Sequence, residues 1–346
     1  MLTDSTMLRD HTTFRIGGPA RRLVTATSEQ EIVATVQDCD ARGEPLLLLG
    51  DGSNVLVADE GFDGTVLKLA NRGMEHNSEA CYGVEVRVGA GETWDDFVAH
   101  CVANEWSGPE ALSGIPGSVG ASPIQNIGAY GAEVGAFVQQ VRTWDRRTGG
   151  IRTIFAADCR FGYRTSIFKQ DPGRFVVIAV TYQMRLGQMS QPVRYPELAA
   201  ALGVEPGERA GATRVRETVL RIRAGKGMVL DEEDRDSWSA GSFFTNPLLT
   251  PEQADALPED APRFPAGDLV KTSAAWLISR AGFPKGHPGR GRARLSSKHV
   301  LALTNHDGAS AADLIALARE VRDGVEARFG IRLTPEVNLI GLSLDD

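Results

Sequence analysis

The segment at residues 112–131 constrains the fold of this chain most, because no other part is as rich in glycine. It reads Leu-Ser-Gly-Ile-Pro-Gly-Ser-Val-Gly-Ala-Ser-Pro-Ile-Gln-Asn-Ile-Gly-Ala-Tyr-Gly. So many small residues cannot fill a core, but they let a backbone pack closely around a large flat or charged ligand. A mobile loop is the alternative, and the interleaved Ile115, Val119 and Ile124 argue against it because they would anchor the segment. We therefore predict an ordered loop that lines a ligand site.

A second glycine loop, Gly-Asp-Gly-Ser-Asn at residues 50–54, follows an apolar run at residues 45–49 that is typical of a fully buried strand. Its glycines would let backbone N–H groups converge on a phosphate. The loop lacks the third glycine of a dinucleotide-binding fingerprint, and a turn between two strands would use the same residues. The sequence alone leaves both interpretations open.

Three further motifs place a polar or charged side chain in an apolar setting. Ser242 lies in Ala-Gly-Ser-Phe-Phe-Thr-Asn-Pro, Arg164 in Phe-Gly-Tyr-Arg-Thr-Ser-Ile-Phe, and Glu336 in a strand-like apolar run near the end of the chain. A buried polar group without a partner costs about 1–3 kcal/mol, so each should meet a ligand or a hydrogen-bond network. A buried turn would explain the serine motif alone, but the three motifs together indicate a ligand site.

Local patterns predict an α/β unit followed by an antiparallel sheet. A strand at residues 23–26, a helix capped by Ser28 and Glu31, and the buried strand at residues 45–49 form the α/β unit. Residues 138–187 alternate short β-type runs with turns, as in a mainly antiparallel sheet. Further helices are expected after Thr93, at residues 214–223, after Thr250, at residues 271–280 and after Ser310. We interpret the helix after Thr93 as core packing alone.

Composition excludes several classes of protein. The 346 residues carry a formal net charge of −8, which argues against a broad electrostatic grip on nucleic acid or anionic membrane. No apolar stretch approaches membrane-spanning length, and the four cysteines form neither a metal-binding nor a disulfide pattern. The amino terminus lacks a basic region followed by an apolar run, so we expect a cytoplasmic protein with no metal site and no membrane insertion. The acidic run at residues 231–234 is interpreted as a solvated surface insertion, and the basic loop at residues 285–294 as a solvated turn or a phosphate contact.

Six motifs in order along the chain resemble those of the UDP-N-acetylenolpyruvoylglucosamine reductase (UDP-N-acetylmuramate dehydrogenase) family. They are Thr-Thr-Phe-Arg-Ile-Gly-Gly at residues 12–18, the loop at 50–54, the glycine-rich segment, Phe-Gly-Tyr-Arg at 161–164, the serine motif at 240–247 and Pro335-Glu336. The resemblance covers nearly the whole chain. It implies an α+β protein whose FAD-binding fold has two α/β subdomains that hold the flavin, with a third α+β domain that binds the substrate. The domains would be residues 1–73 with 333–346, residues 74–223 and residues 224–332.

The resemblance also implies an activity and its site residues. The family uses NADPH and FAD to reduce UDP-N-acetylglucosamine enolpyruvate to UDP-N-acetylmuramate, a cytoplasmic step of peptidoglycan synthesis. Arg164 would bind the substrate carboxylate, Glu336 would share that task as a neutral acid, and Ser242 would deliver a proton. Noncovalent FAD contacts are expected from Gly50, Gly52, Ser53, Asn54, Gly114, Ile115, Pro116, Gly117, Ser118, Gly120, Ala121, Ser122, Asn126, Gly128, Ala129 and Tyr130. Substrate contacts are expected from Tyr163, Tyr195, Lys226, Asn246 and Lys271, with Tyr195 on a loop that closes over the substrate.

Two alternatives remain at this point. An FAD-dependent oxidase or dehydrogenase of small alcohols or sugars often tethers its flavin through His or Cys, and neither residue occurs in the two glycine segments. A flavin or sugar-nucleotide carrier would have little use for a buried arginine, serine and glutamate. We expect the reductase, acting as a monomer.

Overall fold

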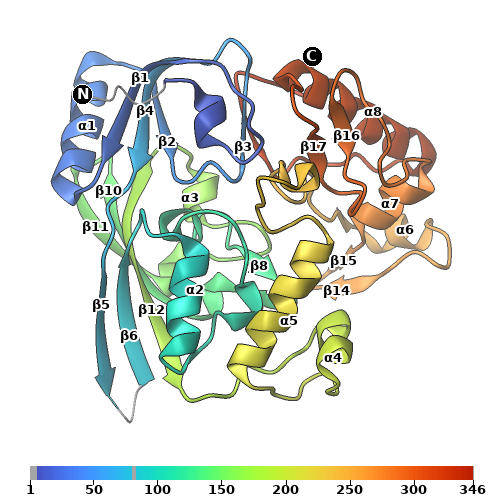
Figure 1. The fold of residues 1–346 in the computed structure, drawn as a ribbon, viewed down its shortest axis with the longest axis horizontal. Helices are drawn as coiled ribbons and strands as arrows, with labels where there is room; N and C mark the ends of the chain where they lie inside the picture. The colour runs from blue at the N-terminus through green and yellow to red at the C-terminus, as the bar shows by residue number, and fades with distance from the viewer. Residues whose placement is uncertain (1–5, 80–82, 346) are drawn as a thin grey trace. The chain divides into compact units, whose positions relative to one another are not determined.

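The computed structural model describes residues 6–79 and 83–345 (Figure 1). Cys81 lies outside the described residues, as do residues 1–5, on which the expected cytoplasmic location rests. The chain divides into two compact units. Unit 1 comprises Met1–Ala20, Gly52–Phe62 and Gly225–Asp346, and unit 2 comprises Arg21–Asp51 and Asp63–Ala224. The division into three domains that the resemblance implies stays a prediction.

Unit 2 contains a small sheet, in the order β1-β4-β2, with helix α1 packed against it. Helix α1 begins where the Ser28 hydroxyl accepts the Glu31 N–H, and it ends at Gly43, whose φ is 62°. The predicted strand, helix and strand are therefore confirmed. In β2 only Leu49 is fully buried, so the expectation of a fully buried strand is wrong for its other leucines. The bounds are β1 (Ala20–Ala26), α1 (Glu29–Arg42), β2 (Leu46–Leu49) and β4 (Phe62–Leu69), with β2 and β4 parallel.

A larger antiparallel sheet of unit 2 has the order β11-β10-β12-β6-β5, with β7 beside β12. This confirms the antiparallel sheet predicted for residues 138–187. Helix α2 (Trp94–Ala103) lies on one face of the sheet and buries Trp94 and Phe97 there (Figure 1). The strands are β5 (Met74–Glu79), β6 (Gly83–Gly89), β7 (Trp106–Ser107), β10 (Val138–Asp145), β11 (Gly150–Phe155) and β12 (Phe175–Leu186).

The remaining elements of unit 2 are short, apart from one helix. Helices α4 and α5 pack on each other through Leu198, Val215 and Val219. Tyr195 immediately precedes α4, where the sequence predicts a loop leading into a helix. The bounds are η2 (Glu110–Leu112), η3 (Val119–Ala121), β8 (Gly128–Ala129), β9 (Ala132–Glu133), η4 (Val134–Ala136), η5 (Ala156–Cys159), α3 (Ile167–Gln170), α4 (Pro196–Leu202) and α5 (Ala212–Gly225).

Unit 1 joins distant parts of the chain, because β3 (Val55–Val57) pairs in parallel with β18 (Asn338–Ile340). Glu336 precedes β18, so its predicted place within a strand is wrong by two residues. The long helix α8 (Ala311–Phe329) starts at the capping box predicted for Ser310 and Asp313. The other bounds are η1 (Leu8–His11), η6 (Arg235–Ser237), β13 (Leu248–Leu249), α6 (Pro251–Asp255), β14 (Phe264–Ala266), β15 (Leu269–Lys271), α7 (Ala274–Arg280), β16 (Ala293–Leu295) and β17 (Leu303–Asn305).

One predicted helix start and one predicted helix cap differ from the structure. Helix α7 begins at Ala274 and not at Lys271, because Lys271 pairs in β15 and the Ser273 hydroxyl accepts the Trp276 N–H. Thr93 precedes α2 as expected but forms no side-chain capping bond.

The mixture of helices and antiparallel sheets confirms the α+β class. In the described part of the chain, no helix combines the length and apolar character needed to cross a membrane.

Candidate active site

The glycine-rich segment is held at Gly114 by charged side chains of unit 2. The Gly114 N–H donates to the Asp95 carboxylate at 2.6 Å, and the Arg223 Nε donates to the Gly114 carbonyl at 3.1 Å. Arg216 forms two further hydrogen bonds with Asp95, at 2.6 and 2.8 Å. Burial disfavours the charge on Asp95, but Arg216 and the Gly114 N–H hold the pKa of this carboxyl below its usual value. Helix α2 thus provides the carboxylate that holds the loop at Gly114. The prediction that limited this helix to core packing is wrong.

Two glycines of unit 2 lie where a side chain would not fit. A Cβ on Gly50 would collide with the Ser118 hydroxyl, and a Cβ on Gly120 would lie 2.5 Å from the Cβ of Ala90. The Gly120 N–H also donates to the Ala90 carbonyl at 2.9 Å. The start of the predicted phosphate loop therefore lies beside the middle of the glycine-rich segment. The Gly50 backbone meets the Ser118 side chain and the Gly120 backbone meets that of Ala90, a close packing that fits the expected cradle for a flavin cofactor.

The rest of the predicted phosphate loop belongs to unit 1. Gly52 has a φ of 65°, and a Cβ there would collide with the His11 carbonyl. The Asn54 side-chain amide donates to the Glu336 carbonyl at 3.2 Å, and the Asn338 N–H donates to the Asn54 carbonyl at 3.1 Å. Within unit 1 this loop therefore lies next to the backbone of Glu336.

Arg164 occupies a tight turn in which Gly162 and Thr165 exchange backbone hydrogen bonds. Its Nη2 donates to the Gly128 carbonyl at 2.8 Å, and its guanidinium lies over the Tyr163 ring, 5.3 Å from the centroid. The backbone at Arg164 is left-handed, with a φ of 52°. A left-handed non-glycine residue persists only where the surrounding structure holds it, and such residues cluster at ligand sites. Turn, carbonyl and ring together orient the group expected to bind a carboxylate.

Two other predicted site residues share this left-handed backbone. Asn126 has a φ of 48° and Tyr130 one of 51°. The Asn126 amide donates to the Glu133 carboxylate at 2.8 Å and to the Gly162 carbonyl at 3.0 Å, so it connects the glycine-rich segment to the Arg164 turn. The structure thereby brings the predicted flavin segment and the predicted carboxylate-binding arginine together.

The two tyrosines at this part of unit 2 contact each other. The rings of Tyr130 and Tyr195 meet edge to face, with centroids 5.6 Å apart. Burial raises the pKa of Tyr130 to about 12, and burial also raises the pKa of the Tyr195 hydroxyl. Both hydroxyls therefore stay protonated at neutral pH and can donate hydrogen bonds. Tyr195 is 43% exposed, as a residue on a substrate-binding loop would be.

In unit 1 the structure brings Ser242 and Glu336 onto adjacent segments. The Phe243 carbonyl, directly after Ser242, accepts the Glu336 N–H at 2.8 Å. The Phe243 N–H donates to the Leu301 carbonyl, also at 2.8 Å. Phe243 and its neighbour Phe244 are fully buried in the hydrophobic core of unit 1.

The predicted substrate residues of unit 1 have different surroundings. The Asn246 Oδ1 accepts the Ala274 N–H at 2.9 Å, at the start of α7. Lys271 pairs with Leu248 in the neighbouring strand, two residues from Asn246. Asn246 and Lys271 are therefore close along this small sheet. Lys226 lies just after α5, and its predicted substrate contact stays a prediction.

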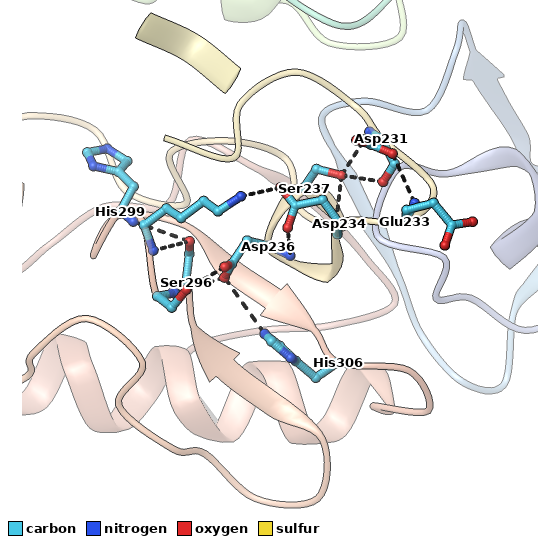
Figure 2. A network of polar contacts seen from close by, with 10 residues as sticks. Asp231, Glu233, Asp234, Asp236, Ser237, Ser296, His299 and His306 are labelled. Atoms are coloured by element: carbon cyan, nitrogen blue, oxygen red, sulfur yellow. Dashed lines mark hydrogen bonds and ion pairs between the residues drawn. The ribbon is translucent and has the colours of Figure 1, made fainter. Parts of the chain in front are cut away.

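The acidic run at residues 231–234 is exposed at Asp231, Glu232 and Glu233, as expected of a solvated insertion, but Asp234 and the following Asp236 are tied into unit 1. Asp236 is only 6% exposed and accepts hydrogen bonds from the N–H of Ser297 at 2.8 Å and from its hydroxyl at 2.5 Å. Asp234 forms an ion pair with Lys298 at 2.7 Å. Figure 2 shows Asp236 between the Ser296 segment and His306. The partners lie about sixty residues further along the chain, which is why the sequence pattern gives no sign of them.

Comparison with known proteins gives the family. Residues 20–154 match the FAD binding domain family, and residues 232–340 match the family of the UDP-N-acetylenolpyruvoylglucosamine reductase C-terminal domain. The chain is 59% identical to the UDP-N-acetylenolpyruvoylglucosamine reductase of Cutibacterium acnes, over 96% of this chain and 89% of that protein. The chain belongs to this reductase family.

Further relatives of the same name agree over similar lengths. The UDP-N-acetylenolpyruvoylglucosamine reductase of Streptomyces coelicolor is 52% identical over 96% of this chain and 88% of that protein. The crystal structure of the reductase from Thermus caldophilus matches with a TM-score of 0.68 at 26% identity, covering 97% of this chain and 98% of that chain. The resemblance that the six motifs indicate is confirmed.

Sequence reasoning missed the residues that hold the reductase motifs in place. Asp95, Arg216 and Arg223 hold Gly114, and Thr13 contacts the segment before Ser242, but none was assigned a role. The available signal was weak: Asp95 is one of two acids in the first turn of α2, which usually marks a helix start.

Among the described residues, no three His, Cys, Asp or Glu side chains gather in a way that could hold a metal ion.

Proposed function

We propose that this chain reduces UDP-N-acetylglucosamine enolpyruvate to UDP-N-acetylmuramate in peptidoglycan synthesis, with FAD as cofactor and NADPH as reductant. The observation that carries the proposal is 59% identity to a reductase of this name over 96% of the chain. FAD, held by the two glycine loops, would supply the hydride chemistry for the methylene carbon of the substrate. A monomer acting in the cytoplasm remains part of the proposal.

The residues of unit 2 would bind and polarise the substrate. Arg164 carries a planar, permanent charge that can form two parallel hydrogen bonds with the substrate carboxylate. As negative charge grows on the carbon next to that carboxylate, the contact strengthens and lowers the barrier. The orientation of Arg164 by Gly128 and Tyr163 supports this role. Tyr195 and Tyr163 would contact the substrate from the same unit.

The residues of unit 1 would complete the proton transfer. The Ser242 hydroxyl would give its proton to the carbon next to the carboxylate and would regain one from solvent in the next cycle. A serine is a weak acid, so it needs a strongly basic acceptor and a dry setting, and the buried Phe243-Phe244 pair supports such a setting. Glu336, whose backbone is bonded to Phe243, would share the polarising task as a neutral acid. Lys226, Asn246 and Lys271 would bind the sugar nucleotide.

NADPH oxidation by the purified protein tests the proposed function. We expect it to depend on the enolpyruvyl sugar nucleotide and to form UDP-N-acetylmuramate, detected by mass spectrometry. An oxidase or dehydrogenase of small alcohols or sugars is the less supported alternative, because the full-length relatives are reductases. Reduction of the flavin by such alcohols, without any response to the enolpyruvyl substrate, would establish that alternative.

We predict that FAD is bound without a covalent bond, because neither Cys nor His occurs at residues 50–54 or 114–131. The described cysteines Cys39, Cys101 and Cys159 are buried, and burial raises the pKa of the Cys101 and Cys159 thiols, which keeps them unreactive. Acid precipitation of the yellow protein should release all flavin to the supernatant. Colour that stays in the washed pellet would contradict the prediction.

We predict that Tyr195→Phe weakens substrate binding and spares FAD content. The substitution keeps the ring that meets Tyr130 and removes only a hydroxyl that stays protonated at neutral pH. Loss of one hydrogen bond to a neutral group costs about 0.5–1.5 kcal/mol, so KM should rise about 2- to 12-fold. The absorbance ratio of flavin to protein and the KM for the enolpyruvyl substrate measure the two effects. A variant that is purified without flavin would show that Tyr195 supports the cofactor site.

A further inference from the structure

The motif at residues 12–18 helps to identify the family, but the roles proposed above leave it without a function. Within it, Thr13 is 5% exposed and contacts two separate parts of unit 1. Its N–H donates to the Gly52 carbonyl at 3.1 Å, and its hydroxyl donates to the Ser239 carbonyl at 2.7 Å. One residue therefore connects the predicted phosphate loop to the segment that leads to Ser242.

The contact at Ser239 extends to Ser242 through one glycine. Ser239 is 3% exposed, and its hydroxyl accepts the Gly241 N–H at 3.1 Å. Gly241 has a φ of 71°, a left-handed conformation that determines the direction in which the next residue leaves the turn. The Thr13 hydroxyl, the Ser239 residue and the Gly241 backbone therefore form one continuous support for Ser242.

Both sides of the Thr13–Ser239 bond are fixed by Asn305, which is 2% exposed. The Asn305 amide donates to the Phe14 carbonyl at 3.0 Å, next to Thr13. The Asn305 N–H donates to the Trp238 carbonyl at 3.0 Å, next to Ser239. Because each partner is held by the same asparagine, the bond joins two rigid segments and resists displacement of either.

We propose that Thr13 is a positioning residue for proton delivery. Its hydroxyl holds the Ser239 carbonyl, so that Gly241 keeps its left-handed conformation and the Ser242 hydroxyl stays at a fixed distance from the Gly52 loop. The proposal rests on the proposed role of Ser242. Thr13 takes no part in bond making. Thr13 affects the rate by keeping Ser242 in place, because a displacement of about 1 Å can slow a reaction about 100-fold.

Thr13→Val tests the proposal, because valine matches threonine in shape but has no hydroxyl to donate. We expect anaerobic reoxidation of the reduced flavin by the enolpyruvyl substrate to slow about 10- to 100-fold. Flavin reduction by NADPH should stay within about twofold of the wild type, the range expected for independent sites. Thr13→Ser keeps the donor and should restore most of the lost rate. Hydrogen exchange, followed on the peptide that contains Gly241, should be faster in Thr13→Val than in the wild type.

Thr12→Val is the matched control. Thr12 is also buried, at 3% exposure, but its hydroxyl donates to the Ile16 carbonyl at 3.0 Å, within its own motif. It should change both half-reactions by no more than about twofold. If the flavin of Thr13→Val is reoxidised as fast as that of Thr12→Val, the positioning role is overturned. The same holds if Thr13→Val slows flavin reduction and flavin reoxidation equally. If Thr13→Val does not fold, Ser239→Ala tests the next link of the support, because it removes the side-chain bond to Gly241 and keeps the carbonyl that Thr13 binds. Reoxidation at the wild-type rate in Ser239→Ala would then overturn the inferred support of Ser242.

A double variant separates this proposal from the proposed function. If Thr13 acts through Ser242, Thr13→Val should change reoxidation by less than about twofold when Ser242 is already alanine. Equal losses in both backgrounds would show that Thr13 acts by another route and would overturn the inference. If the flavin of the single variant Ser242→Ala is reoxidised at the wild-type rate, the proposed role of Ser242 is refuted instead.

Discussion

Ser242→Ala should leave NADPH-dependent flavin reduction intact and slow reoxidation by the enolpyruvyl substrate by about 10²–10⁴-fold, the usual contribution of general acid catalysis. The reason is that Ser242 is assigned to one proton transfer that follows flavin reduction. Alanine can follow Gly241 in the same turn, and the bonds from Phe243 to Leu301 and Glu336 are made by the backbone. Anaerobic stopped-flow absorbance of the flavin measures each half-reaction separately.

Two further variants of the same loop sharpen this experiment. Cysteine is a better acid of similar size, so Ser242→Cys should lose less rate than Ser242→Ala. Thr245→Val removes a hydroxyl whose bond goes to the Thr334 carbonyl, at 3.4 Å, and it should leave reoxidation unchanged. Ser242→Ala could slow flavin reduction by NADPH as much as reoxidation, or it could leave the reoxidation rate unchanged. Either result would show that the serine is a structural hydroxyl and that the mechanism has another acid.

Arg164→Lys should slow the substrate half-reaction by about 10²–10³-fold, the effect typical of losing a donor that stabilises developing negative charge. A lysine provides a point charge and cannot reproduce two parallel hydrogen bonds to a carboxylate. It would also lose the planar group that lies over the Tyr163 ring. Flavin reduction by NADPH should change little, because it precedes substrate binding. Stopped-flow rates for the two half-reactions test the difference.

Arg160→Lys provides the control for Arg164→Lys. Arg160 lies four residues earlier, is exposed, and has a left-handed backbone with a φ of 50°, close to that of Arg164. The same substitution in a similar backbone setting should leave both rates unchanged. Equal losses in both half-reactions for Arg164→Lys would assign the arginine a structural role in holding Gly128.

Features of the fold that depend on neighbours in sequence were predictable. The cap of α1 follows from the Ser28 hydroxyl, and that of α8 from the capping box of Ser310 and Asp313. The start of α7 has a local signal in Ser273, whose hydroxyl caps the helix, but the pairing of Lys271 with Leu248 across a sheet is not visible in a propensity pattern. The predicted start at Lys271 therefore lies three residues before the observed start at Ala274.

The candidate site shows the same limit at longer range. The glycines and the polar residues in apolar runs were visible, because their types are unusual for their surroundings. The side chains that support them were not, since Asp95 meets Arg216 and Thr13 meets Ser239 across long stretches of chain. The burial of Asp236 was missed for the same reason, because its partner Ser297 lies in another part of the sequence. Single-residue chemistry identifies the reacting groups, whereas their supports depend on the folded topology.

The parallel pairing of β3 with β18 limits when this part of unit 1 can fold during synthesis. Val55–Val57 is synthesised before the whole of Asp63–Ala224, whereas Asn338–Ile340 is synthesised after it, just behind Glu336. The whole of Arg21–Asp51 and Asp63–Ala224 is translated before that second strand exists. During translation, β3 therefore lacks this strand partner until Asn338–Ile340 has emerged from the ribosome. Synthesis of residues 336–340 supplies the partner strand and the proposed catalytic glutamate together.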